Sequence, residues 1–142
     1  MSSKPMSIWG PPTKPRIPKG TVPKSFTMTA QELREREVLA WSERVFQGHV
    51  VELARSLGFS LVYHTYDSRR SQPGFPDLVL VNPGRGRLLF RELKSAKERI
   101  SGEQKRWGDG FRAVGADFDF WRPQDWVSGR IECELKGGGF GA

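Results

Sequence analysis

The chain has 142 residues, of which 37% are hydrophobic and 27% are charged, and its net charge is +7. This length suits one domain with one sizeable core. A single cysteine excludes an internal disulfide framework and a cysteine-based zinc cluster, and two histidines argue against an all-histidine metal site. The basic charge indicates a polyanionic partner. We find neither a membrane-spanning run nor a secretory signal, so we expect a soluble, cytoplasmic protein.

The first 28 residues differ in composition from the rest. They contain six prolines and five basic residues but no acidic residue, which leaves residues 29–142 with a net charge of +2. Such a segment cannot bury enough apolar area to offset its ordering entropy. We therefore expect a disordered basic arm over 1–28, which either contacts phosphates or is a solvated leader. A folded domain over 29–135 and a flexible glycine-rich tail over 136–142 would follow.

Two helices are predicted first. Thr29 and Glu32 fit a capping box that opens one helix. Ser42 is positioned to cap a second helix, which runs from about Glu43 to Leu57 and ends at Gly58. Its apolar residues recur at helical spacing: Phe46, Val50, Leu53 and Leu57.

Strand patterns dominate the next part of the chain. We predict strands over 59–66, 77–81 and 87–94, with a polar loop over 67–74 and a tight turn over 82–86. A second capping box, Ser101 to Gln104, begins a helix that ends near Gly115, with Trp107 facing the core. A strand over 117–121, in which Trp121 is also a core residue, a turn over 122–126 and a short edge strand over 130–135 complete the order. This order predicts an α/β domain with a mixed sheet flanked by helices.

Charged residues stand at the ends of two otherwise apolar strands. Asp77 begins one strand, and Glu92 and Lys94 end the next. A tight turn joins these strands, so they are expected to be antiparallel neighbours that bring the three side chains to one edge of the sheet. Two close carboxylates repel each other unless a cation lies between them, and oxygen ligands suit Mg²⁺ or Mn²⁺. The carbonyl of Leu93 would add another oxygen. In the alternative, Asp77 caps a turn and Glu92 and Lys94 form an ion pair.

The pattern "GFPD…RELK" resembles the PD-(D/E)XK nuclease superfamily and, more narrowly, the VRR-NUC family, with similarity from Ser42 to Trp126. The resemblance implies a restriction-endonuclease-like core of a mixed sheet and flanking helices. It also implies residue roles, as follows: metal ligands Asp77, Glu92 and Glu43, catalytic lysine Lys94, and supporting glutamines Gln47 and Gln104. Glu52 is an alternative helical acid, and Gln104 could serve only its capping box. The last strand departs from an apolar pattern, because it carries Asp117 and Asp119.

The resemblance implies a metal-dependent DNA endonuclease of a bacterium or phage, similar in architecture to archaeal Holliday-junction resolvases. It also implies a homodimer with two active sites, and branched DNA (a Holliday junction or a flap) is the preferred substrate. Two alternatives are a non-catalytic DNA-binding subunit with the same fold and a sequence-specific restriction-type enzyme. Clustered side chains around the predicted site would contact phosphates: His64, Arg69, Arg70, Lys97, Arg99, Lys105 and Arg106.

Overall fold

The computed structural model describes residues 27–65 and 70–138. The strands are β1 (Leu61–His64), β2 (Leu78–Asn82), β3 (Arg87–Leu93) and β4 (Phe118–Trp121). The helices are α1 (Ala30–Leu39), α2 (Glu43–Ser56), α3 (Gly102–Ala113), α4 (Pro123–Val127) and α5 (Arg130–Leu135), with a 3₁₀ turn over Pro83–Arg85.

Several sequence-based expectations fall wholly or partly outside the described residues. They are the basic arm up to residue 26, the end of the strand predicted over 59–66, the start of the loop predicted over 67–74 together with Arg69, and the part of the glycine-rich tail after residue 138. Within the described part of the chain, none of the helices is long and apolar enough to cross a membrane.

The four strands form one mixed sheet in the order β1-β2-β3-β4. β1 pairs with β2 and β2 with β3 in antiparallel fashion, whereas β3 and β4 run parallel. A parallel pair needs a long crossover connection, and the segment that carries α3 supplies it. The predicted α/β class and mixed sheet are therefore confirmed.

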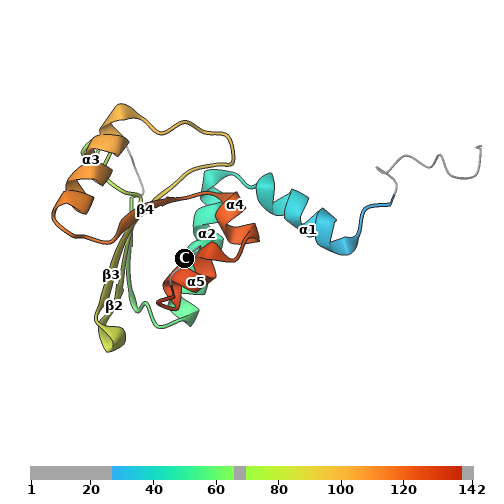
Figure 1. Ribbon diagram of the computed structural model, residues 1–142, viewed down its shortest axis with the longest axis horizontal. Coiled ribbons are helices and arrows are strands. Elements are labelled where there is room, and N and C mark those ends of the chain that lie inside the picture. Colours follow the sequence, from blue (N-terminus) through green and yellow to red (C-terminus); the bar gives the residue numbers. More distant parts are fainter. Residues whose placement is uncertain (1–26, 66–69, 139–142) are drawn as a thin grey trace, which may run out of the picture. The chain divides into compact units, whose positions relative to one another are not determined.

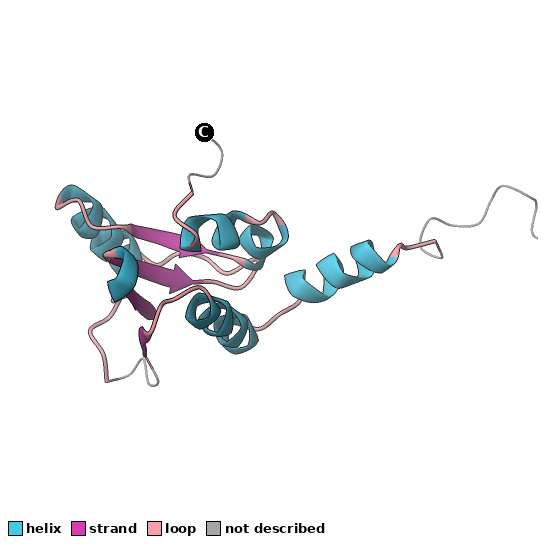
Figure 2. Ribbon diagram, turned by 90° about the horizontal axis from the view of Figure 1, so that it is seen from below, coloured by secondary structure: helices cyan, strands magenta, loops and turns pink. Residues whose placement is uncertain are grey.

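Helices cover both faces of this sheet (Figure 1; Figure 2). α2 and α5 share one face, where their apolar side chains pack against the buried side chains of the strands. α3 lies on the other face, where Phe111 stacks on Phe90 with ring centroids 4.4 Å apart. The fully buried residues of the first face form the main core: Phe46, Val50, Ala54, Phe59, Leu78, Leu80, Leu89, Leu93, Trp121, Ile131 and Leu135.

Helix caps follow the predicted sequence signals. The side chain of Ser42 accepts a hydrogen bond from the amide of Val45 at the start of α2. Both predicted capping boxes form, one at Thr29 and Glu32 and one at Ser101 and Gln104. These caps satisfy amides that the first turn of a helix leaves without a partner.

The acidic residues near β4 are structural partners of arginines. Arg91 is only 1% exposed, and it donates to the Asp117 carboxylate at 2.8 Å and lies over the Trp121 ring. Arg130 pairs with Asp119, which is also 3.3 Å from Arg112. A buried guanidinium needs such partners. The charges at this strand therefore tie β3, β4 and α5 together.

Two predictions for the C-terminal part are wrong. The segment expected to be an edge strand, Arg130 to Leu135, is helix α5, and the turn expected over residues 122–126 contains helix α4. The apolar residues of "RIECEL" fit both periods, because Ile131 and Leu135 are two strand repeats or one helical turn apart. The helix wins because both side chains can enter the core from one face.

The expected core position of Trp107 is also wrong, whereas that of Trp121 is confirmed. Trp107 is 36% exposed, and Trp121 is fully buried. On α3 it is Gly108 and Phe111 that approach the sheet, while the Trp107 indole Nε1 donates to the carbonyl of Pro73 at 3.1 Å.

Close packing of α3 on β4 gives a stability prediction. A Cβ at Gly108 would lie 2.5 Å from the Phe118 ring, whereas a Cβ at Gly110 meets nothing within 4 Å. We expect Gly108→Ala to lower the free energy of unfolding by about 1–3 kcal/mol through overpacking. The matched change Gly110→Ala should raise it by about 0.5–1 kcal/mol through helix propensity. Urea denaturation measures both, and equal effects of the two changes would contradict this packing.

Candidate active site

Asp77 and Glu92 are held to each other across the β2–β3 pair. The Asp77 amide donates to Glu92 Oε2 at 3.0 Å, and the Leu93 amide donates to Asp77 Oδ2 at 3.0 Å. This follows from the register, in which Leu78 lies opposite Arg91 and so places the preceding residue beside Glu92. The predicted convergence of the two carboxylates at the sheet edge is present in the structure.

Gln104 joins α3 to this pair of acids. Its Nε2 donates to Glu92 Oε1 at 2.6 Å, while its Oε1 accepts from the Ser101 amide at 2.9 Å. The two interpretations of Gln104, as part of a capping box and as a site residue, are therefore compatible. One amide side chain closes the helix start and orients the carboxyl group of Glu92.

Glu43, and not Glu52, is the helical acid near the pair. It is the first residue of α2, directly after the Ser42 cap, and it lies close enough to Asp77 for their charges to repel. Glu52 is on the exposed side of the same helix. Gln47 is one turn after Glu43 and is half-buried.

Lys94 lies at the end of β3 and is 4% exposed. Its amide donates to the carbonyl of Trp121 at 3.0 Å, which fixes the backbone against β4. Its Nζ is 3.5 Å from Glu98 Oε1. The side chains of Glu98 and Glu43 also share a hydrogen bond.

Glu98 is the residue that sequence analysis missed. It lies in the irregular segment between β3 and α3, where strand or helix periodicity does not say which way a side chain points. The available signal was its spacing of four residues from Lys94, which brings opposite charges together in a turn.

Burial and mutual repulsion raise the pKa values of three of these acids, Glu43, Asp77 and Glu92, which we call the acidic cluster. Burial, followed by the charge of Asp77, raises the pKa of Glu92 to about 9. Burial and Asp77 also raise the pKa of Glu43 to about 7, with a further contribution from its hydrogen bond to Glu98. Burial raises the pKa of Asp77 as well, although the hydrogen bond from Leu93 opposes this shift. The site thus concentrates more negative charge than Lys94 alone can neutralise.

The acids are close, but they are committed to bonds within the protein. In residues 27–65 and 70–138, no three His, Cys, Asp or Glu side chains are arranged to hold a metal ion. Both oxygens of Glu92 accept hydrogen bonds from protein donors, as does Oδ2 of Asp77.

The described basic residues predicted to bind phosphate lie on three segments. His64 ends β1, and the exposed Arg70 lies in the loop that leads toward Asp77. The remaining four are exposed in the loop after Lys94 or in the first two turns of α3: Lys97, Arg99, Lys105 and Arg106. In the sequence, His64 and Arg70 precede Asp77, and the other four follow Lys94.

The raised pKa values predict how stability depends on pH without divalent cations. From about pH 4.5 the folded protein holds protons that the unfolded chain releases, up to about pH 7 on Glu43 and up to about pH 9 on Glu92. This stabilisation is therefore present at low pH and lost as pH rises. Glu92→Gln should flatten the fall. Urea unfolding in a chelator from pH 5 to 9 measures this, and identical slopes for both proteins would contradict the assigned shifts.

Comparison with known proteins identifies the family of this chain. A region of 43 residues is 44% identical to the Fanconi-associated nuclease 1 homolog of Schizosaccharomyces pombe (strain 972 / ATCC 24843), and it spans 30% of this chain but only 6% of that protein. A solved structure described as "VRR_NUC domain" is 29% identical, with a TM-score of 0.45, covering 60% of this chain and 92% of its own. The profile of the VRR-NUC domain matches residues 25–122, which include the whole acidic cluster. The chain therefore belongs to the VRR-NUC family, whose nuclease fold is of the PD-(D/E)XK type.

Proposed function

We propose that this protein is an Mg²⁺- or Mn²⁺-dependent endonuclease that hydrolyses DNA phosphodiester bonds. The observation that supports this most is the meeting of Asp77, Glu92 and Lys94 at the end of one antiparallel strand pair. In this proposal Asp77, Glu92, Glu43 and the Leu93 carbonyl hold the cation, and Lys94 acts on the substrate.

The chemistry of these residues fits a divalent cation. The donors are carboxylate and carbonyl oxygens, which hard cations prefer. Burial and the charge of Asp77 raise the pKa values of Glu43 and Glu92, and a cation beside them would oppose this shift. Cation binding would supply that positive charge, release the protons and replace hydrogen bonds that the carboxyl groups now make within the protein.

Each remaining residue has a physical task in this proposal. The bound cation would polarise a phosphoryl oxygen and lower the pKa of a water molecule. Lys94, whose backbone is held by β4 and whose side chain is nearly buried, would donate to that water or to the negative charge that develops on the phosphate. Gln104 orients Glu92, and Gln47 would support the α2 side of the site.

The basic side chains around the site support DNA as the substrate. Exposed lysines and arginines on the loop after Lys94 and on α3 would hold phosphates without reading bases. We therefore propose selectivity for DNA structure, with Holliday junctions or flaps as preferred substrates. The similarity to a protein named a nuclease supports cleavage over the alternative of a non-catalytic subunit.

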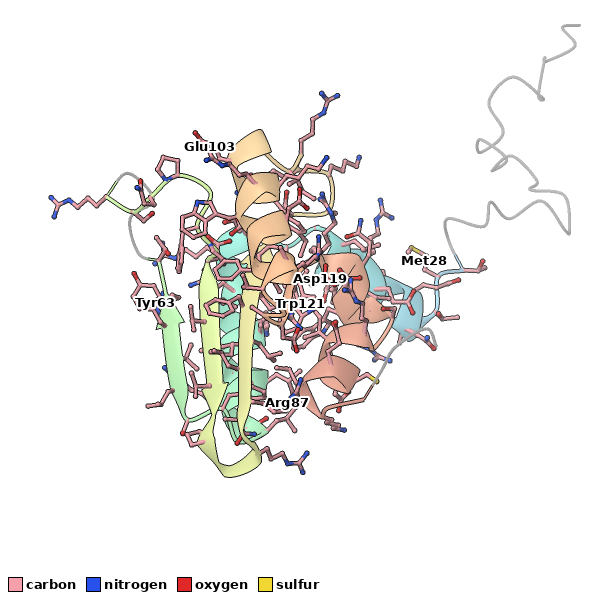
Figure 3. The ribbon with its side chains drawn as sticks, turned by 60° about the vertical axis from the view of Figure 1, so that its left-hand side comes forward. Met28, Tyr63, Arg87, Glu103, Asp119 and Trp121 are labelled. Atoms are coloured by element: carbon pink, nitrogen blue, oxygen red, sulfur yellow. The ribbon has the colours of Figure 1, made fainter. Side chains whose placement is uncertain are left out.

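We also propose a homodimer, because two active sites suit a branched substrate. An apolar sheet face supports this proposal: Leu61 of β1 and Leu88 of β3 both lie opposite Val81, and they are 58% and 47% exposed. Tyr63, on the same strand as Leu61, is 56% exposed (Figure 3). An apolar surface of this kind is a candidate contact between two copies of the chain.

Cleavage assays on labelled blunt duplex, flap, splayed-arm and four-way DNA test the proposed function. We expect Mn²⁺- or Mg²⁺-dependent cutting, with the branched substrates preferred. Glu92→Ala should abolish it, and Lys94→Met should slow it by on the order of 10²–10³-fold, as for other charge-stabilising groups. DNA affinity should remain within a few-fold of wild type, because phosphate contacts carry binding.

A matched pair on α2 provides the control. Glu43→Gln should reduce cleavage strongly, whereas Glu52→Gln, on the exposed side of the same helix, should leave it unchanged. Binding without any cleavage would favour the non-catalytic alternative. Cutting of random linear duplex at one sequence would favour the restriction-type alternative.

The proposed dimer has a separate test. The double change Leu61→Lys and Leu88→Lys should convert a dimer into a monomer in sedimentation velocity experiments, because buried lysines would repel across a symmetric interface. Val114→Lys, at an 81% exposed position after α3, should have no effect. A wild-type protein that remains monomeric at all concentrations would contradict the proposal.

A further inference from the structure

A groove of about 770 Å³ runs beside α3. It lies between the outer side of the helix and the loop before Asp77, and Figure 3 shows Glu103 at the helix start that borders it. Aromatic, cationic and amide side chains line it together: Trp107, Phe111, Arg106 and Gln72. Pockets of this size and mixed character accommodate flat ligands with polar edges.

Trp107 is both exposed and held in place. Its indole Nε1 donates to the carbonyl of Pro73 at 3.1 Å, and the Phe75 ring packs edge-on against it at 5.3 Å. Phe111 lies beside it at 5.8 Å. With 36% of its surface exposed, Trp107 thus presents a fixed aromatic surface to the groove at little further entropic cost on binding.

Two backbone segments connect the groove to the acidic cluster. Gln104, which donates to Glu92, is one turn before Trp107 on α3, a separation of about 4.5 Å along the helix axis. The loop that carries Pro73 and Phe75 continues directly into Asp77. Gly74, at φ +86°, lets this loop approach the Glu103 backbone so closely that a Cβ would lie 2.5 Å from it.

The lining side chains indicate which ligand would enter. Arg106 and Glu103 both line the groove, Lys105 is exposed next to Arg106 in the sequence of α3, and Arg99 is exposed on the loop before the helix. A nucleotide combines a flat base, which stacks on tryptophan, with a phosphate, which pairs with arginine.

We propose that this groove binds one unpaired nucleobase of the DNA substrate, stacked on Trp107, close to the phosphodiester that is cut. The proposal rests on the proposed nuclease function and assigns a specificity-determining site to it. An unpaired base occurs in a flap but not within an intact duplex, so the groove would favour flap DNA among the branched substrates.

The test uses flap DNA that carries 2-aminopurine at successive unpaired positions, with the full chain in a chelator so that no cutting occurs. Stacking on an aromatic ring quenches 2-aminopurine fluorescence. We expect quenching at one or two adjacent positions. Trp107→Ala should abolish it and weaken flap binding ~5- to 100-fold, the range for loss of one stacked base. Trp107→Phe should retain most of the quenching.

A second pair of variants guards against a folding defect. Gly110 lines the groove, and a Cβ there meets no other atom within 4 Å. Gly110→Leu should fill the groove and reduce both quenching and flap preference, whereas Gly110→Ala should retain both. Absence of quenching at every position, or equal quenching in Trp107→Ala and wild type, would overturn the proposal. Persistent Mn²⁺-dependent cleavage in that event would leave the nuclease function intact.

Discussion

The site depends on two hydrogen bonds, one from the Asp77 amide to Glu92 and one from the Leu93 amide to the Asp77 carboxylate. Both bonds link the residue just before β2 to the end of β3: the Asp77 amide donates to the Glu92 carboxyl group, and the Asp77 carboxylate accepts from the amide of Leu93, the residue after Glu92. Ordinary antiparallel pairing thus fixes two acids beside each other at the rim of a buried sheet. Changing the register by one residue would turn these side chains to opposite faces.

Holding two carboxyl groups close together at a buried position is electrostatically unfavourable, and neighbouring groups offset part of this. Glu92 is only 3% exposed, so its carboxyl group cannot be fully hydrated, and its pKa rises to about 9. Lys94 and the amide of Gln104 offset part of this cost. The core that α2 and α5 form on one face holds the strands rigid, while α3 brings Gln104 to the site from the other. A divalent cation would complete the charge balance in the proposed mechanism.

Sequence reasoning identified the elements that depend on local signals. A few neighbouring residues are enough to predict each of these elements: the caps at Ser42 and Ser101, the helical apolar stripe that begins at Phe46, and the tight turn before β3. The meeting of Asp77 with Glu92 followed from that turn and from strand alternation. The roles of these residues in catalysis stay predictions until activity is measured.

The wrong predictions concern segments whose structure depends on residues that are distant in the sequence. "RIECEL" alternates like a strand, but only the core decides that Ile131 and Leu135 enter it as one helical face. Trp107 appears at a core spacing, yet the sheet is already covered where Phe111 stacks on Phe90. The acids Asp117 and Asp119 broke an apolar pattern because their partners, Arg91 and Arg130, come from other elements. Glu98 lies in an irregular loop, where no periodicity could assign its direction.

The most direct test of the central claim is anomalous diffraction at the manganese edge from crystals soaked in Mn²⁺. The account predicts a manganese peak roughly 2 Å from carboxylate oxygens of both Asp77 and Glu92, with the Glu92 carboxyl group turned away from its present bond to the Asp77 amide. Ordered crystals that take up manganese elsewhere, or not at all, while Glu92 retains that bond would contradict it.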